Sequence, residues 1–156
     1  MKHTIIRILF AIFTLSMASS TDSFAQAPAP SAADYDKSQP FRARIYNKEF
    51  KVFMVINAYE QNIEVPGQEI FGEMAGYFRS DDDSRCWLIT SCELSADGKS
   101  LALSITNDYG SEDLEATLSV NSDGVYTLKQ LSGSQIKIAR NKKWVKIPRS
   151  LQLTIK

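Results

Sequence analysis

Residues 114–120 read Leu-Glu-Ala-Thr-Leu-Ser-Val, and this alternation of apolar and polar side chains decides the fold class. Successive side chains of a β-strand point to opposite faces of a sheet, so a period of two buries one face and leaves the other in water. The same period recurs in residues 41–46, 101–106 and 151–156. The sequence therefore predicts a domain built almost entirely of strands.

Short turn signals separate these runs, including Asp97-Gly98, Asp123-Gly124 and Asn141-Lys142. Gly, Asn and Asp tolerate the backbone angles of tight hairpins. Strands joined by such short connections are antiparallel, because a parallel crossover needs a dozen or more residues. We expect an all-β antiparallel meander of eight to ten short strands that closes into a small barrel or a barrel-like sandwich.

The first 25 residues predict a secretory signal peptide. Lys2 and Arg7 form a positive start, residues 8–17 are apolar, and Ser23 and Ala25 are the small residues expected before a cleavage site after Ala25. Cleavage two residues later also fits the pattern. The apolar run is too short to span a bilayer, which needs about 20 apolar residues, and no later stretch approaches that length. We expect an exported product, periplasmic or secreted, that is soluble after cleavage and has no membrane span.

The remaining chain divides into a leader and one domain. Residues 26–40 are rich in Ala, Pro and Ser without apolar periodicity, which indicates a flexible leader. Residues 41–156 are numerous enough to bury a core without metals or several disulfides. They are expected to form a single barrel-like domain.

Two runs carry apolar side chains on both faces. In residues 50–59, Phe53 and Val55 lie out of phase with the other apolar positions, and residues 70–78 show the same two-sided pattern. Such strands need cover on both sides, which the leader, a loop or a second copy of the chain in a homodimer would supply. A second face left open would instead be a binding surface.

Gly72 and Gly76 fall inside the second of these runs, where glycine indicates a bend of the sheet. If both face outward at the bend, Phe71, Glu73 and Tyr77 lie on the concave side. The Glu73 carboxylate is then partly buried and is a candidate ligand contact; an ordinary ion pair with an Arg or Lys of a neighbouring strand is the alternative. Phe71, Glu73 and Tyr77 form the first candidate binding surface.

The two cysteines, Cys86 and Cys92, are six residues apart in a run without turn residues. On one extended strand they are roughly 20 Å apart, whereas a disulfide requires a Cα separation of about 4.4 to 6.8 Å. We therefore expect no disulfide between them. Burial of both thiols is the favoured interpretation, and a folded-over strand or an intermolecular bridge remains open.

The sequence makes catalysis a poor hypothesis. The sole histidine, His3, belongs to the predicted signal peptide, so the mature chain is expected to lack the Ser-His-Asp and Cys-His mechanisms and histidine-ligated zinc. Asp81, Asp82 and Asp83 lack the regular spacing of a calcium loop and indicate a solvated turn. No nucleotide fingerprint is present. We predict no metal site, no cofactor and no catalytic residue.

Charge is distributed unevenly along the chain. Residues 60–128 contain 14 Asp and Glu against three basic residues, whereas residues 129–156 contain eight Lys and Arg and no acid. Attraction between the two parts across the closed sheet is the simplest interpretation. Trp144, however, shares strand parity with Lys142 and Lys146, and a tryptophan among lysines on an outer face is suited to bind a glycan, an anionic polymer or a protein. Nucleic acid is not an expected partner of an exported protein of near-neutral charge.

Two resemblances follow from short motifs. Residues 70–77, 101–103, 132–138 and 143–148 resemble uncharacterised small exported β-barrel proteins of Gram-negative bacteria, a resemblance that implies the fold and an envelope location but no activity. Residues 122–126 and 132–134 resemble the serine, glycine and tyrosine loops with which barrel-shaped periplasmic lysozyme inhibitors enter a lysozyme cleft, although the disulfide arrangement and the full loop of those inhibitors are not matched.

These observations lead to one main functional hypothesis and two alternatives. We expect a non-enzymatic binding module whose partner is a protein or a glycan of the cell envelope. The alternatives are a lysozyme-type glycosidase inhibitor and a carboxylate-dependent hydrolase. The candidate binding residues are Phe71, Glu73, Tyr77, Lys142, Trp144 and Lys146.

Overall fold

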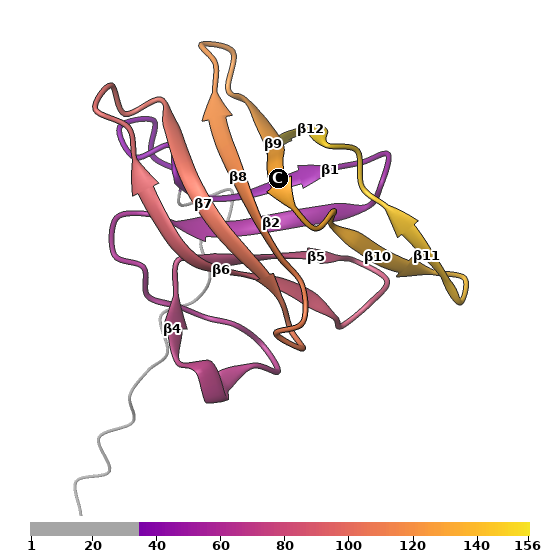
Figure 1. Cartoon of the computed structure of the whole chain (residues 1–156). Helices are drawn as coiled ribbons and strands as arrows, with labels where there is room; N and C mark the ends of the chain where they lie inside the picture. The colour runs from indigo at the N-terminus through magenta and orange to yellow at the C-terminus, as the bar shows by residue number, and fades with distance from the viewer. Residues whose placement is uncertain (1–34) are drawn as a thin grey trace, which may run out of the picture.

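The computed structural model describes residues 35–156, which form a closed antiparallel barrel of eight strands (Figure 1). The predicted signal peptide and the first part of the leader lie outside the described residues. Around the barrel the strand order is β1-β12-β9-β8-β7-β6-β5-β2, so neighbours in the chain are neighbours in the sheet and β12 closes onto β1. The predicted small barrel is confirmed. The barrel strands are β1 (Arg42–Asn47), β2 (Val52–Asn57), β5 (Gly76–Ser80), β6 (Cys86–Leu94), β7 (Ser100–Asn107), β8 (Asp113–Val120), β9 (Val125–Gly133) and β12 (Ser150–Ile155).

Two small hairpins interrupt the meander and lie outside the barrel wall (Figure 1). The first joins β3 (Ile63–Glu64) to β4 (Glu73–Met74) and carries the 3-10 helix Glu69–Phe71 between them. The second joins β10 (Lys137–Arg140) to β11 (Lys143–Lys146). Both are insertions between sequential barrel strands, so they add surface features without changing the barrel order.

Apolar side chains fill the interior of the barrel. In the regularly alternating strands, such as β7 and β8, the alternating apolar residues point inward and the residues between them point outward, as the period of two predicts. Phe41 and Tyr126 meet edge to face, with ring centroids 6.2 Å apart. The largest fully buried side chains of this interior cluster are Tyr126, Phe41, Phe78, Ile45, Met54, Ile56, Ile89, Leu101, Leu103, Ile105 and Leu118.

The two-sided strands are covered by a segment of the same chain. Phe53, Val55 and Tyr77 point outward from β2 and β5 and form a second buried cluster with Ile63 and Val65 from the connection between these strands. Of the covers considered from the sequence, a loop is therefore the one found. Residues 70–78 are not one strand, because the 3-10 helix and β4 precede β5, and that part of the prediction is wrong.

The two glycines of this region have different roles. Gly76 is buried in β5, and a Cβ there would lie 2.1 Å from the Val55 carbonyl oxygen, so glycine permits the close approach of β5 to β2. Gly72 follows the 3-10 helix with a φ of 71°, which a residue with a side chain adopts at a cost. The glycines serve strand contact and a turn rather than one shared bend of the barrel.

The cysteines are free and buried, and they point to opposite sides of the barrel wall. Cys86 belongs to the outer cluster and Cys92 to the interior. A regular strand would direct both thiols to one face, but a bulge between Ile89 and Ser91 shifts the register of β6 against β7. Burial raises the pKa of the Cys86 thiol to about 11 and also raises the pKa of Cys92.

The last residues of the predicted leader lie against one end of the barrel. Tyr35 packs against the interior cluster, and the Tyr126 hydroxyl donates a 2.5 Å hydrogen bond to the Pro40 carbonyl oxygen. Among residues 35–156 there is no helix with the length and hydrophobicity that crossing a lipid bilayer requires.

Candidate binding site

A pocket of about 240 Å³ lies outside the barrel, where three separate segments meet. The first is the connection between β5 and β6, residues 81–85. The second is the connection between β7 and β8, residues 108–112. The third is the β10–β11 hairpin, which contributes Trp144; we name this cavity the Trp144 pocket. Its lining residues are Arg79, Ser80, Asp83, Arg85, Cys86, Trp87, Asn107, Asp108, Tyr109, Ser111, Glu112, Lys137, Ile138, Ala139 and Trp144.

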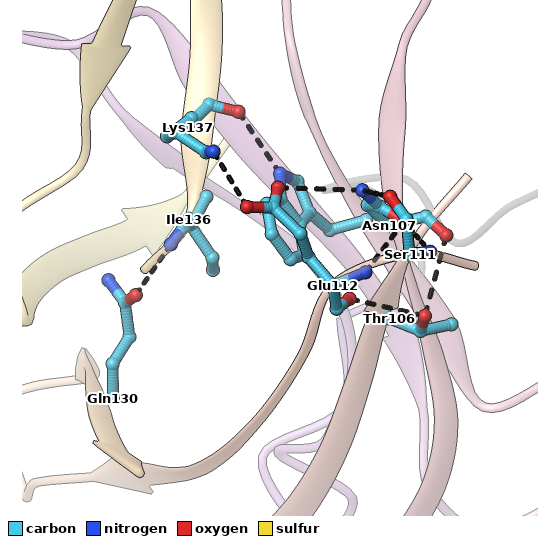
Figure 2. A network of polar contacts seen from close by, with 8 residues as sticks. Thr106, Asn107, Ser111, Glu112, Gln130, Ile136 and Lys137 are labelled. Atoms are coloured by element: carbon cyan, nitrogen blue, oxygen red, sulfur yellow. Dashed lines mark hydrogen bonds and ion pairs between the residues drawn. The ribbon is translucent and has the colours of Figure 1, made fainter. Parts of the chain in front are cut away.

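The β10–β11 hairpin is held at its base by Gln130. This side chain is buried in β9, where its Oε1 accepts a 2.8 Å hydrogen bond from the Ile136 N–H (Figure 2). Its Nε2 donates to the carbonyl oxygens of Ile147 and Pro148. Gln130 thus binds the chain on both sides of the hairpin. Because buried polar groups without partners are costly, these bonds fix where the hairpin leaves the barrel.

At the tip of this hairpin, Asn141 and Lys142 have φ angles of 50° and 62°. Positive φ at both central residues is what a two-residue type I′ hairpin turn requires. The turn places Trp144 opposite Ala139 in the register, and both residues line the pocket.

One face of the Trp144 ring is covered by Arg85. The guanidinium carbon of Arg85 lies 4.6 Å from the ring centroid, within the range of a cation–π contact. Asp83 orients the guanidinium, because its two carboxylate oxygens accept hydrogen bonds from Arg85 Nε at 3.0 and 3.1 Å. These hydrogen bonds lower the pKa of the Asp83 carboxyl from its ordinary value. Trp144 nevertheless remains 59% exposed.

Asn107 shapes the loop that forms the second wall. Its side-chain oxygen accepts hydrogen bonds from the N–H groups of Ser111 and Glu112, at 2.9 and 3.3 Å, and its amide nitrogen donates to the Ser111 hydroxyl (Figure 2). The loop presents Tyr109, whose side chain is 75% exposed, at the rim of the pocket. The pocket therefore has two exposed aromatic rings from different segments.

An ion pair joins this loop to the hairpin. Lys137 Nζ donates to Glu112 Oε1 at 2.7 Å, and the Lys137 carbonyl oxygen accepts a 3.0 Å hydrogen bond from Trp87 Nε1 (Figure 2). Trp87 is one of the buried barrel residues. The same lysine is thus fixed by the barrel through its backbone and by the loop through its side chain, which keeps the two walls together.

Arg79 differs from the other two cations of the pocket. Within residues 35–156 no carboxylate lies within 4.0 Å of it, and its buried Nε has no hydrogen-bond partner. Its guanidinium carbon lies 5.7 Å from the centroid of the Phe53 ring and 5.9 Å from that of Tyr77. Arg79 is therefore a cation beside aromatic rings that forms no ion pair, although, after the hydrogen bonds from Arg85, its charge also helps to lower the pKa of Asp83.

Half of the candidate residues named from the sequence gather around this pocket. Trp144 lines it, Lys146 is directly opposite the lining residue Lys137, and Lys142 lies in the adjacent turn. All three are exposed. Trp144 and Lys146 share one face of β11, as strand parity predicts. Lys142 lies in the turn before β11, so strand parity does not determine where its side chain points.

The other three candidates do not form a common surface. Phe71 is exposed in the 3-10 helix, whereas Tyr77 is 5% exposed in the outer cluster, where it packs edge to face against Phe53. Glu73 is exposed on β4 opposite Glu64 and is not on a concave, partly buried face. That placement was wrong because Glu73 belongs to β4 of the external β3–β4 hairpin and not to a barrel strand.

The residues missed from the sequence are those contributed by loops. Arg79, Arg85 and Lys99 are the only basic residues in the acidic region 60–128, and two of the three line the pocket. That rarity was a usable signal. No pattern within any one strand indicated that Tyr109 and Asp108 would join them, because that juxtaposition depends on barrel closure.

The basic C-terminal region is mostly without ion pairs. Of the eight Lys and Arg in residues 129–156, only Lys137 forms an ion pair with an acidic side chain of the described chain. Arg140 instead donates to the Phe50 carbonyl oxygen. Direct pairing between the acidic and basic parts is thus limited to Lys137 and Glu112, and much of the basic charge stays on the surface.

The two stretches that resemble lysozyme-inhibitor loops lie at opposite ends of β9. Residues 122–124 form the turn before this nine-residue strand, and Ser132 and Gly133 end it. At about 3.3 Å per residue these ends are roughly 25 to 30 Å apart. Tyr126, the tyrosine of the resemblance, is fully buried. The two stretches do not form one continuous loop surface.

Within residues 35–156 no three His, Cys, Asp or Glu side chains gather as a group able to hold a metal ion. No protein family, curated protein or solved structure matches the chain. The resemblances of residues 70–77, 101–103, 122–126, 132–138 and 143–148 to known families therefore stay predictions.

Proposed function

We propose that this protein is a non-enzymatic binding module of the bacterial cell envelope and that the Trp144 pocket holds a glycan. The observation that carries the proposal is the pairing of two exposed aromatic rings, Trp144 and Tyr109, at the rim of a pocket with polar walls. Sugar rings present C–H groups that pack on aromatic faces, while their hydroxyls need oriented donors and acceptors.

The polar walls are held in place before any ligand arrives. Asp83 and Arg85 fix one another, Glu112 and Lys137 fix one another, and Asn107 closes its own loop. A preorganised site loses less conformational entropy on binding than a flexible one. The arrangement is therefore suited to recognition of a ligand whose hydroxyls lie in a defined pattern.

The same geometry favours binding over hydrolysis. A glycosidase needs one carboxylic acid with a raised pKa and a second carboxylate beside it. Arg85 lowers the pKa of Asp83, and Lys137 engages Glu112. Glu73, the carboxylate singled out from the sequence, is exposed on an external hairpin and does not line the Trp144 pocket. A lysozyme inhibitor is disfavoured by the separation of its two candidate stretches.

The location in the envelope rests on the predicted signal peptide. Intact mass of the protein purified from a Gram-negative host is expected to correspond to a chain beginning at Gln26. Recovery of the uncleaved chain from the cytoplasm alone would contradict export.

Binding is tested with the purified protein on an array of neutral and acidic oligosaccharides and on isolated envelope polysaccharide. Trp144→Ala is expected to weaken binding about tenfold, because it removes the exposed ring. Lys129→Ala, at an exposed position of β9 that does not line the pocket, should change little. Equal binding by Trp144→Ala and the unaltered protein, or no glycan bound by either, would remove this function.

A further inference from the structure

We propose that the ligand of the Trp144 pocket is a carboxylate-bearing sugar and that Arg79 binds the carboxylate. This inference rests on the proposed glycan function and assigns its chemical class. The starting point is a lining cation of the pocket that forms no ion pair with a described residue. Arg85 pairs with Asp83 and Lys137 with Glu112, so Arg79 is the lining cation without a carboxylate partner among the described residues.

Arg79 is prepared for an anion. The aromatic rings of Phe53 and Tyr77 lie within 6 Å of its guanidinium and keep water from part of it. Its Nε is buried without an acceptor. A guanidinium binds a carboxylate through two parallel hydrogen bonds, and such charge-assisted bonds are stronger where water is excluded. A neutral sugar would offer Arg79 no charge-assisted hydrogen bond of this kind.

Asp108 supplies a complementary group two strands away. Arg79 is the register partner of Cys86, and the Asp108 N–H donates to the Cys86 carbonyl oxygen, so Arg79 and Asp108 lie on either side of Cys86. Two strand spacings put their backbones about 10 Å apart. Asp108 forms no ion pair with a described residue. A sugar acid fits both groups, because its carboxylate accepts from Arg79 and its hydroxyls donate to Asp108.

The hairpin adds further positive charge at the rim. Lys146 lies directly opposite Lys137 in the register and, unlike Lys137, forms no ion pair with a described residue. It therefore adds positive charge that would attract an anionic ligand. The three carboxylates of the pocket, Asp83, Asp108 and Glu112, disfavour a doubly charged phosphate. Beside these three carboxylates, a singly charged carboxylate is repelled less than a doubly charged phosphate.

The test compares sugars that differ only in the charged group. The probes are oligosaccharides of galacturonic acid, glucuronic acid and N-acetylmuramic acid, the methyl esters of all three, and phosphorylated glucose oligosaccharides. For at least one pair, the acid is expected to bind the unaltered protein about tenfold more tightly than its ester by isothermal titration calorimetry. Arg79→Met is expected to lower affinity for the acid to that for the ester, while its ester binding stays unchanged and reports an intact site.

Arg79→Lys keeps the positive charge but loses the planar pair of N–H donors. Its affinity for the acid is expected to lie between those of the unaltered protein and Arg79→Met. Lys129→Met, an equal loss of charge on β9, should preserve the preference. Equal affinity for acids and esters would overturn the inference while the glycan function stands. Preference for the phosphorylated sugars would replace the carboxylate by another anion. Binding of no sugar at all would remove both proposals.

Discussion

The guanidinium carbon of Arg85 lies 4.6 Å from the centroid of the Trp144 ring, and Asp83 holds that guanidinium through both of its carboxylate oxygens. An exposed tryptophan is thus positioned by an arginine from a connection almost sixty residues earlier in the chain. The contact makes Trp144 part of a wall and not a loose side chain on a hairpin.

Replacement of Arg85 by Met is expected to release the Trp144 ring, because the cation that covers one of its faces is lost. The measurement is ¹⁵N relaxation of the indole N–H groups. The order parameter of the Trp144 indole should fall, whereas that of Trp87, whose indole N–H donates to the Lys137 carbonyl oxygen at 3.0 Å, should not change. Equal mobility of Trp144 in both proteins would show that Arg85 does not restrain it.

The ion pair of Asp83 and Arg85 predicts a pH-dependent contribution to stability. The pKa of Asp83 is lower in the folded chain than its ordinary value, so folding favours the ionised carboxylate. The contribution is complete above the unfolded pKa of about 3.9 and is lost as the pH falls through the lower folded pKa. The stability difference between the unaltered protein and Asp83→Asn should be constant above about pH 5 and shrink toward about pH 2.

Urea unfolding at several pH values measures this difference. Asp82→Asn is the matched control, since Asp82 is the exposed neighbour in the same turn. A gap for Asp83→Asn that is the same at pH 7 and pH 2.5 would contradict the proposed linkage.

Gln130→Leu is expected to destabilise the fold by at least about 2 kcal/mol, because it leaves the Ile136 N–H and two carbonyl oxygens at the hairpin base without their partner. Gln152→Leu makes the same exchange at an exposed position of β12 and should have little effect. Urea unfolding gives the free energies, and amide hydrogen exchange at Ile136 and Ile147 localises the loss. Slow exchange at both amides in Gln130→Leu would refute the anchoring role.

Gly76→Ala is expected to cost about 2 kcal/mol or more, because the new Cβ would lie 2.1 Å from the Val55 carbonyl oxygen and force β5 away from β2. Gly98→Ala tests backbone strain without contact, since Gly98 has a φ of 67° and no atom within 4 Å of an added Cβ. It should cost about 1 kcal/mol. Thermal and urea unfolding of both variants measure the two losses of stability. A larger loss for Gly98→Ala than for Gly76→Ala would show that β5 can shift to accommodate the added Cβ.

Cys86 and Cys92 are expected to resist modification in the folded protein, since both thiols are buried and burial raises both pKa values. Treatment with iodoacetamide at pH 8 should add nothing to the native monomer and two groups after unfolding in guanidinium. Non-reducing mass spectrometry should give the reduced monomer mass. A loss of two hydrogens, or a dimer that a reductant separates, would contradict burial as free thiols.

Local sequence determined the strands of this protein and their inward faces. Alternating residues such as Leu114, Ala116 and Leu118 form one face of a strand in any sheet, and connections of a few residues allow only antiparallel neighbours. The barrel class followed from these two facts. The apolar side chains of Phe53 and Val55 also predicted that something must bury the outer face of this strand. The leader, a loop or a second copy of the chain would each have met that requirement.

Tertiary structure alone decided three features: which segment covers the outer face of β2 and β5, where the register of β6 shifts, and where the pocket lies. The bulge in β6 is set by pairing with β7, and it sends Cys86 and Cys92 to opposite sides although their numbers share parity. Glu73 lies on an external hairpin for the same reason, because long-range strand pairing, and not the local sequence pattern, determines which segments become barrel strands. The Trp144 pocket joins Arg79, Tyr109 and Trp144 from three segments, a juxtaposition that exists only once the barrel has closed and Gln130 has fixed the hairpin beside it.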